Sequence, residues 1–232
     1  PKKPGRIWGH AEILGKGVNW MQRSKITEGF VDAAIPFIKK AKQDNKPFYI
    51  NLWPDDVHTP FWPPVEQWKD GSKRQLFLSV LEEMDRQLGK LFDHVQNNPD
   101  LADNTIILAC SDNGPEKGAG VAGPFRGYKT HLYEGGIRSS LVAWAPKLMA
   151  TQAKGTINKK SILSAIDLVP TLLEITKTKT PKHANFDGES LPDVLLGKSN
   201  SSRKQDLLFR RPPDRDSFYG VEDLPDLAIR SG

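Results

Sequence analysis

The chain has 232 residues, of which 38% are hydrophobic and 26% are charged, and its formal net charge is +5. This composition is typical of a globular protein, and no apolar run approaches the roughly 20 residues that span a membrane. Acidic residues are interleaved with the lysines and arginines throughout. That pattern argues against a nucleic-acid binder and favours a small or polymeric anionic substrate.

The two ends and the single cysteine bear on the origin of the chain. The basic start at residues 1–6 is not followed by an apolar segment, so it is not a signal peptide. Because the first residue is Pro1, we expect the chain to begin within a longer protein. Cys110 is the single cysteine of the sequence, so an internal disulfide is excluded. The apolar residues around Cys110 predict a buried, inert thiol.

The first predicted element is a helix over residues 27–42. Its apolar residues recur at helical spacing, and Thr27 is suited to the N-cap position. Pro36 lies inside it, so we expect a kink or an early break there.

Two strands and a helix follow. A strand is predicted at 48–53, a long amphipathic helix at 72–97, and a continuously apolar strand, buried on both faces, at 105–110. Since strand, helix and strand succeed one another, we expect the two strands to be parallel neighbours or near neighbours.

The glycine-rich stretch 111–136 is too long for a simple connector, and such loops are usually functional or disordered. A further strand is predicted at 137–144. Asp167 is suited to cap a helix that has Pro170 in its first turn.

Composition shifts after about residue 176 toward Lys, Ser, Asp and Pro. Short apolar pieces at 207–209 and 227–229 predict strands of a smaller unit. We therefore expect residues 1–176 to belong to a catalytic α/β domain and residues 177–232 to a smaller C-terminal subdomain.

The first candidate site is the loop after the strand at 48–53, since ligands of open α/β sheets bind at the carboxyl ends of strands. His58 lies there between prolines and is suited to donate a proton or to contact an anion, or else to be held by a backbone hydrogen bond. Asp55 and Asp56 offer carboxylates to a metal, although adjacent carboxylates more often form a turn or a cap.

The second and third candidates lie in the glycine-rich stretch. Asp112 and Asn113 offer hard oxygen ligands for Ca²⁺ or Mg²⁺, and equally form an ordinary Asp-Asn-Gly turn. Lys129 is either a cation for an anionic group or an exposed loop lysine. Glu134 and Arg138 are suited to pair and brace the loop. Together the candidates suit metal-assisted hydrolysis of a charged ester.

Four motifs, in order and at similar spacing, resemble the sulfatase family. They are His-Thr-Pro at 58–60, Ser-Asp-Asn-Gly-Pro at 111–115, Gly-Pro-Phe-Arg-Gly-Tyr-Lys at 123–129 and Glu-Gly-Gly-Ile-Arg at 134–138. Segments 167–173 and 187–191 also resemble later landmarks of that family. The resemblance extends over nearly the whole chain from about Thr27.

The resemblance implies a fold and a chemistry. The fold is α/β of the alkaline-phosphatase-like type, with a mixed, mostly parallel sheet flanked by helices and a small C-terminal antiparallel α+β subdomain. Asp112 and Asn113 match two of four side-chain ligands of a Ca²⁺ site, with Mg²⁺ the less favoured ion. His58 and Lys129 match catalytic residues that contact the sulfate, and His58 is a candidate for the acid that assists the leaving oxygen.

Three departures from the family pattern concern the nucleophile and the metal. The family nucleophile is a formylglycine made in a Cys/Ser-x-Pro-x-Arg motif, and this sequence contains no such motif. The sequence also lacks the family's N-terminal pair of Asp ligands and its later Trp-Lys element. We therefore expect a fragment that is inactive alone and comes from a sulfuric ester hydrolase. Uncovered sheet edges would favour self-association. The family implies a periplasmic, secreted or lysosomal location.

Two other functions stay open. One is a phosphodiesterase or phosphonate hydrolase of the same superfamily, which a different nucleophile would distinguish. The other is a non-catalytic module that binds sulfated glycans. The expected partner is a sulfated small molecule or glycan, with no nucleic acid and no membrane span.

Overall fold

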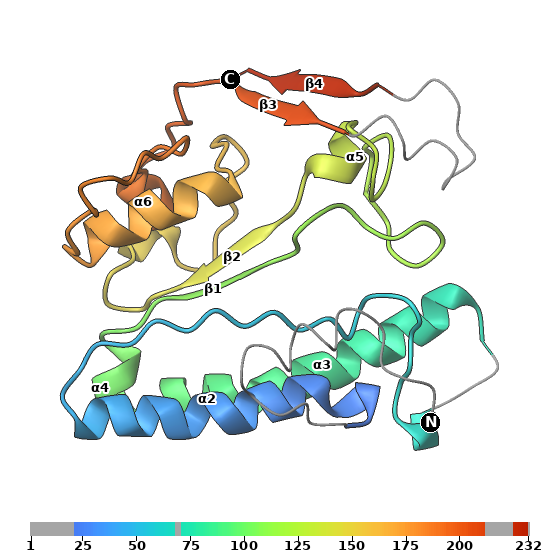
Figure 1. Cartoon of the computed structure of the whole chain (residues 1–232), viewed down its shortest axis with the longest axis horizontal. Coiled ribbons are helices and arrows are strands. Elements are labelled where there is room, and N and C mark those ends of the chain that lie inside the picture. The colour runs from blue at the N-terminus through green and yellow to red at the C-terminus, as the bar shows by residue number, and fades with distance from the viewer. Residues whose placement is uncertain (1–20, 68–70, 212–224, 232) are drawn as a thin grey trace. The chain divides into compact units, whose positions relative to one another are not determined.

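A computed structural model describes residues 21–67, 71–211 and 225–231 (Figure 1). The chain divides into two compact units, Pro1–His94 and Val95–Gly232. Each unit is described by itself below. Within the described ranges, no helix is both long enough and apolar enough to cross a membrane.

The division into two units differs from the predicted division at residue 176, which stays a prediction. Both helices and strands are present, as expected for an α/β protein. The elements of the first unit are η1 (Arg23–Lys25), α2 (Ile26–Gln43), η2 (Val65–Gln67) and α3 (Lys73–Gln96).

Helix α2 corrects two details of the sequence prediction. Lys25 occupies the N-cap position, and Thr27 lies inside the helix with its buried hydroxyl donating to Asp56 at 2.6 Å. The helix also runs through Pro36 without an early break. Pro36 and Asp32 lie on the exposed face, so water can hydrate the Asp32 carbonyl that lost its helical donor.

The start of α2 is capped by a side chain of α3. Gln87 is fully buried, and its Oε1 accepts from the Glu28 amide at 2.7 Å. Its Nε2 donates to the Ser24 carbonyl at 2.6 Å and to Glu83 Oε1 at 2.5 Å. Since α2 has no side-chain cap of its own, Gln87 supplies a partner that the first turn otherwise lacks.

The predicted strand at 48–53 is not formed among the described residues, where no strand occurs before residue 107. Exposure still alternates along it, and Tyr49 and Trp53 are 70% and 75% exposed. A strand requires a hydrogen-bonded neighbour, whereas the sequence pattern reports only β propensity and burial. The predicted parallel pairing of 48–53 with 105–110 is accordingly not observed.

The second unit contains α4 (Pro99–Ala102), β1 (Ile107–Cys110), α5 (Glu134–Ile137) and β2 (Leu141–Trp144). β1 pairs antiparallel with β2, with Ile107 opposite Trp144 (Figure 1). β1 is not buried on both faces, because Ala109 and Cys110 are exposed; the predicted buried thiol is therefore wrong. The strand predicted at 137–144 starts later, because α5 occupies its first position.

The remaining elements are η3 (Thr151–Ala153), α6 (Ala165–Ile175), α7 (Pro192–Leu195), β3 (Leu207–Arg210) and β4 (Leu227–Arg230). β3 and β4 pair antiparallel, which confirms the two C-terminal strands. Both pairings among the described residues are antiparallel, so the mostly parallel sheet is not observed there.

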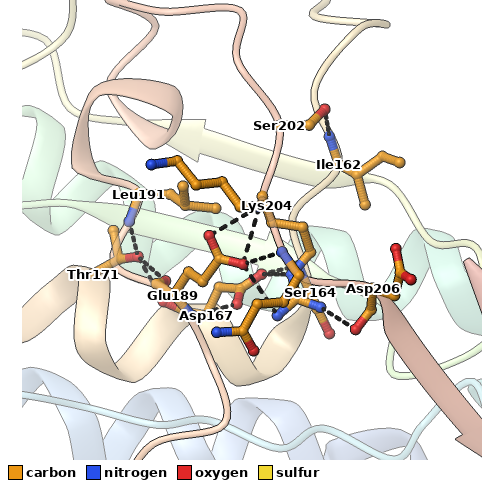
Figure 2. A network of polar contacts seen from close by, with 11 residues as sticks. Ile162, Ser164, Asp167, Thr171, Glu189, Leu191, Ser202, Lys204 and Asp206 are labelled. Atoms are coloured by element: carbon orange, nitrogen blue, oxygen red, sulfur yellow. Dashed lines mark hydrogen bonds and ion pairs between the residues drawn. The ribbon is translucent and has the colours of Figure 1, made fainter. Parts of the chain in front are cut away.

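Asp167 holds the end of α6 in place but is not the N-cap. Ser164 is the N-cap, and Asp167 is its partner in a capping box, accepting from the Ser164 amide at 2.7 Å. Its other oxygen, Oδ1, accepts from the Glu189 amide at 2.8 Å (Figure 2). Arg203 Nε lies 3.4 Å from Oδ2, the oxygen that binds the Ser164 amide. Asp167 and Arg203 are both buried, so each offsets the cost of burying the other's charge.

Glu189 extends this network. Its carboxylate accepts from the amides of Lys204 and Gln205 at 2.7–3.0 Å, and these backbone donors lower the pKa of Glu189. Thr171 donates to the Asp167 carbonyl and accepts from the Leu191 amide. The two segments that resemble late family landmarks therefore bind each other through buried polar contacts.

Replacing Gln87 with leucine is expected to lower the free energy of unfolding by about 2–4 kcal/mol, because the Glu28 amide and the Ser24 carbonyl lose a buried partner. Urea denaturation measures the effect. The matched control is Gln96→Leu at the exposed end of the same helix. Equal midpoints for the two variants would show that Gln87 does not cap α2.

Candidate functional site

His58 is exposed in the loop of the first unit. Its Nδ1 lies 2.8 Å from the Thr59 carbonyl oxygen, and its amide donates to the Asp55 carbonyl at 2.9 Å. A carbonyl accepts only, so Nδ1 must carry a proton. Nε2 is then the other ring nitrogen: it accepts in the neutral ring and can donate a proton only when the ring is doubly protonated.

The carboxylates beside His58 brace the loop. Asp56 is buried and accepts from Thr27, while Asp55 pairs with Arg23 at 3.1 Å. Arg23 also donates to the Asp55 carbonyl at 2.7 Å and to the His58 carbonyl at 3.0 Å. Each carboxylate thus has a protein donor, and the pair lies in a turn, although Asp56 is buried in that turn and neither residue caps a helix.

Asp112 and Asn113 lie directly after β1 in the second unit. Asp112 is exposed and Asn113 is half-buried. In the described part of the chain, neither side chain makes a hydrogen bond or an ion pair. The turn is held by its neighbours, because Ser111 Oγ donates to the Asn113 carbonyl at 2.9 Å and Ser139 donates to the Ser111 carbonyl at 2.8 Å.

Backbone hydrogen bonds fold the glycine-rich stretch back on itself. The Gly114 amide donates to the Gly136 carbonyl at 2.8 Å, and the Lys129 amide donates to the Pro115 carbonyl at 2.9 Å. The Gly135 amide donates to the Arg126 carbonyl at 2.7 Å, which completes the folded-back loop. Lys129 is therefore placed next to the turn that carries the two oxygen donors.

This fold leaves no room for side chains at its crossing points. A methyl group at Gly136 would overlap the carbonyl oxygens of His131 and Tyr128, and one at Gly114 would overlap that of Gly135. All three glycines at the crossing are buried. The close approach of backbone to backbone is the reason for the Glu-Gly-Gly sequence.

Lys129 is not the fully exposed lysine that the sequence allowed as an alternative. Its side chain is 25% exposed, and its ammonium lies 3.8 Å from Glu116 Oε2. A distance of this length leaves the ammonium able to contact a second anion. Because the charge is compact and partly desolvated, it attracts an anionic group more strongly than an exposed lysine does.

Glu134 and Arg138 form the predicted pair, with 2.9 Å between Oε2 and Nη1. Arg230 of β4 binds the other oxygen of Glu134, a partner that sequence reasoning missed. Arg138 also stacks 4.4 Å over the ring of Phe125. These contacts fix the end of the loop against β4 and are structural.

His131 is a second residue that sequence reasoning missed, although tyrosines flank it closely in the sequence. It is 7% exposed, its ring centroid lies 4.1 Å from that of Tyr128, and its buried Nε2 has no hydrogen-bond partner in the described residues. Burial, and then the charge of Arg211, lowers the pKa of His131. Its contribution to stability is present above the unfolded pKa near 6.5 and is lost as pH falls through the folded value.

The two side chains at the turn are of the chemical type that binds a hard cation. Asp112 and Asn113 supply a carboxylate and an amide without protein partners, as Ca²⁺ prefers. Within the described ranges, however, no group of three or more His, Cys, Asp or Glu residues gathers as a metal cluster. Ca²⁺ takes about 6–8 oxygen ligands, so these two residues account for only part of a site.

The predicted site residues fall in both units. Lys129, Asp112 and Asn113 lie in the second unit, where a backbone hydrogen bond joins Lys129 to Pro115, whereas His58 lies in the first. Convergence of His58 with the other three stays a prediction.

Comparison with known proteins agrees with this arrangement of motifs. Residues 15–178 match the family model described as Sulfatase. The chain is 31% identical over 215 residues to an arylsulfatase of Hemicentrotus pulcherrimus, covering 91% of this chain and 35% of that protein. It is 27% identical to arylsulfatase G of Rattus norvegicus, covering 85% of this chain and 39% of the relative.

A solved structure gives the same indication. The crystal structure of Ps i-CgsB in complex with k-i-k-neocarrahexaose superposes with a TM-score of 0.75 at 27% identity, over 94% of this chain and 46% of that one. The chain thus spans 35–46% of the length of these relatives.

Gly136→Ala is expected to destabilise the fold by about 2–4 kcal/mol, because the new methyl meets backbone oxygens that cannot rotate away. Gly89→Ala is the control, since a methyl there meets nothing within 4 Å and should stabilise α3 by about 0.5–1 kcal/mol. Denaturation midpoints measure both. An unaffected Gly136→Ala variant would contradict the close approach at the loop crossing.

Proposed function

This chain belongs to the sulfatase family, and on that premise we propose that it forms part of an enzyme that hydrolyses sulfate esters. The observation that supports the proposal is the hydrogen bond from the Lys129 amide to the Pro115 carbonyl, which holds the backbone of a partly buried lysine against the turn that carries Asp112 and Asn113. A cation and oxygen donors without protein partners at one strand end suit an ester whose anionic group must be held.

The residues have distinct proposed roles. Lys129 binds a sulfate oxygen and stabilises the charge that grows there during reaction. His58 contacts the sulfate and gives its Nε2 proton to the leaving oxygen, while the Thr59 carbonyl and the Asp55 turn orient its ring. Arg23 and Thr27 position this loop through Asp55 and Asp56.

Asp112 and Asn113 would hold Ca²⁺ together with ligands from outside this sequence. When bound, the ion would supply positive charge that offsets the charge of the sulfate oxygens. We also propose a formylglycine nucleophile, made from a Cys or Ser that this sequence does not contain. The 232-residue chain alone is accordingly expected to be inactive.

The proposed substrate is a sulfated glycan or a smaller sulfate ester. Support comes from the neighbour whose structure is described as a complex with k-i-k-neocarrahexaose, and from a 29% identical relative named N-acetylgalactosamine-6-sulfatase of Rattus norvegicus. The expected periplasmic, secreted or lysosomal location, and self-association through sheet edges, stay predictions.

In the full-length protein, Lys129→Ala is expected to reduce turnover of an aryl sulfate by about a hundredfold, the typical loss when one preorganised charge-stabilising group is removed. Lys117→Ala is the matched control in the same loop, because Lys117 stacks 5.2 Å over Tyr128 and has no role in the proposed chemistry. Steady-state kinetics measure both. Near-normal turnover by Lys129→Ala would remove this residue from the site.

A further inference from the structure

Two loops of the second unit lie side by side. Both follow the candidate site residues in the sequence. The Ala150 amide donates to the Leu196 carbonyl at 3.0 Å, and Ser202 Oγ donates to the Lys160 carbonyl at 3.2 Å. A methyl at Gly197 would overlap Ala153. Residues 150–162 and 196–203 therefore run in the same direction along each other.

This pair of loops carries a concentration of positive charge. Five lysines on it are exposed: Lys154, Lys159, Lys160, Lys198 and Lys204. No acidic residue occurs in residues 148–166 or 194–205. Among the residues that the structure describes, none of the five ammonium groups is engaged in an ion pair, so the fold does not use them. We call these five residues the lysine face.

The backbone beneath the lysine face is fixed. Asn158 Oδ1 accepts from the Lys160 amide at 2.9 Å, and the Lys198 amide donates to the Asp193 carbonyl at 2.7 Å. The Lys204 amide is held by Glu189. Because the backbone is already ordered, a ligand has to immobilise only the lysine side chains, which limits the entropy cost of binding.

Three acids lie near this surface, and none of them forms an ion pair with the five lysines among the described residues. The Glu189 carboxylate is engaged by backbone amides and by Arg203, which lies 3.9 Å away. Asp193 and Asp206 lie at the two ends of the second loop and contact it through their backbone carbonyls, Asp193 with the Lys198 amide and Asp206 with Arg203. A run of like charge with no counter-charge between its members is suited to a polyanion.

We propose that the lysine face binds the chain of a sulfated polysaccharide, outside the site that cleaves it. The inference deepens the proposed function and rests on it, since it makes a polymer the substrate class. Neither loop contains an aromatic residue on which a base could stack. Single-stranded nucleic-acid sites use such platforms, so the composition favours a sulfated glycan over nucleic acid.

The test measures binding of the 232-residue chain to fluorescent dextran sulfate at about 50 mM salt, where electrostatic contacts are only partly screened. Each of the double variants Lys159→Ala/Lys160→Ala and Lys198→Ala/Lys204→Ala should weaken binding by about tenfold or more, as one lysine near an anionic surface typically contributes about fivefold. Binding should also weaken as salt rises, and neutral dextran should not bind.

The matched control is Lys179→Ala/Lys182→Ala, which removes the same charge from an exposed loop of the same unit and should change affinity less than twofold. Lys129→Ala removes a single proposed sulfate contact and leaves the five lysines in place, so it should weaken polymer binding less than either lysine-face variant. Absence of aryl-sulfate turnover in the full-length protein would overturn the proposed function alone. Equal affinities for the control and the lysine-face variants, or equally tight binding of a single-stranded oligonucleotide, would overturn the inference.

Discussion

The hydrogen bond from the Lys129 amide to the Pro115 carbonyl, with its neighbour from Gly114 to Gly136, is the constraint on which the candidate site depends. Without these two bonds, the residues between 111 and 136 would form an irregular loop with no defined place for a cation. With them, the loop doubles back and the backbone of Lys129 lies against Pro115, at the end of the turn that carries Asp112 and Asn113. The glycines at the crossing are needed because a Cβ there would occupy the space of a carbonyl oxygen.

Many of the residues that carry the family resemblance serve structure before chemistry. Asp167 and Glu189 come from two separate landmark segments and are joined by a backbone hydrogen bond and by the buried Arg203 (Figure 2). Removing any one of them would leave a buried charge without its partner, which is costly in a low-dielectric interior. His58, Lys129, Asp112 and Asn113 are the residues to which we assign a ligand. The motifs therefore combine a few reactive groups with a larger set that holds them in place.

The sequence predicted α2, α3, α6 and the two C-terminal strands, because their patterns are set by local sequence, but not the four-residue helices α4, α5 and α7. It failed where the partner is distant in the chain. The helix start at Thr27 was misplaced since the cap comes from Gln87, 59 residues beyond the Glu28 amide that it binds. The strand at 48–53 has the right composition, but pairing is a property of a neighbour that local sequence does not encode.

Contacts between residues distant in the chain also limited the prediction of the site. The residue types and their order indicated an anion and a hard cation, and the glycines indicated close backbone approach. The location of Lys129 beside Pro115, the Arg230 contact with Glu134 and the burial of His131 all arise from the folding of the loop. The burial of Cys110 was wrongly predicted because an apolar strand need not be covered on both faces.

Amide hydrogen exchange of the folded chain, read residue by residue, tests the doubled-back loop most directly. The amides of Gly114, Lys129 and Gly136 are donors to carbonyls and should exchange slowly, whereas those of Gly118 and Val121 lie at exposed positions of the same loop and should exchange rapidly. Protection confined to the first group is the result that the account predicts. Equally fast exchange of Lys129 and Val121 would show that the bond to Pro115 is absent and that Lys129 is not held beside Asp112 and Asn113.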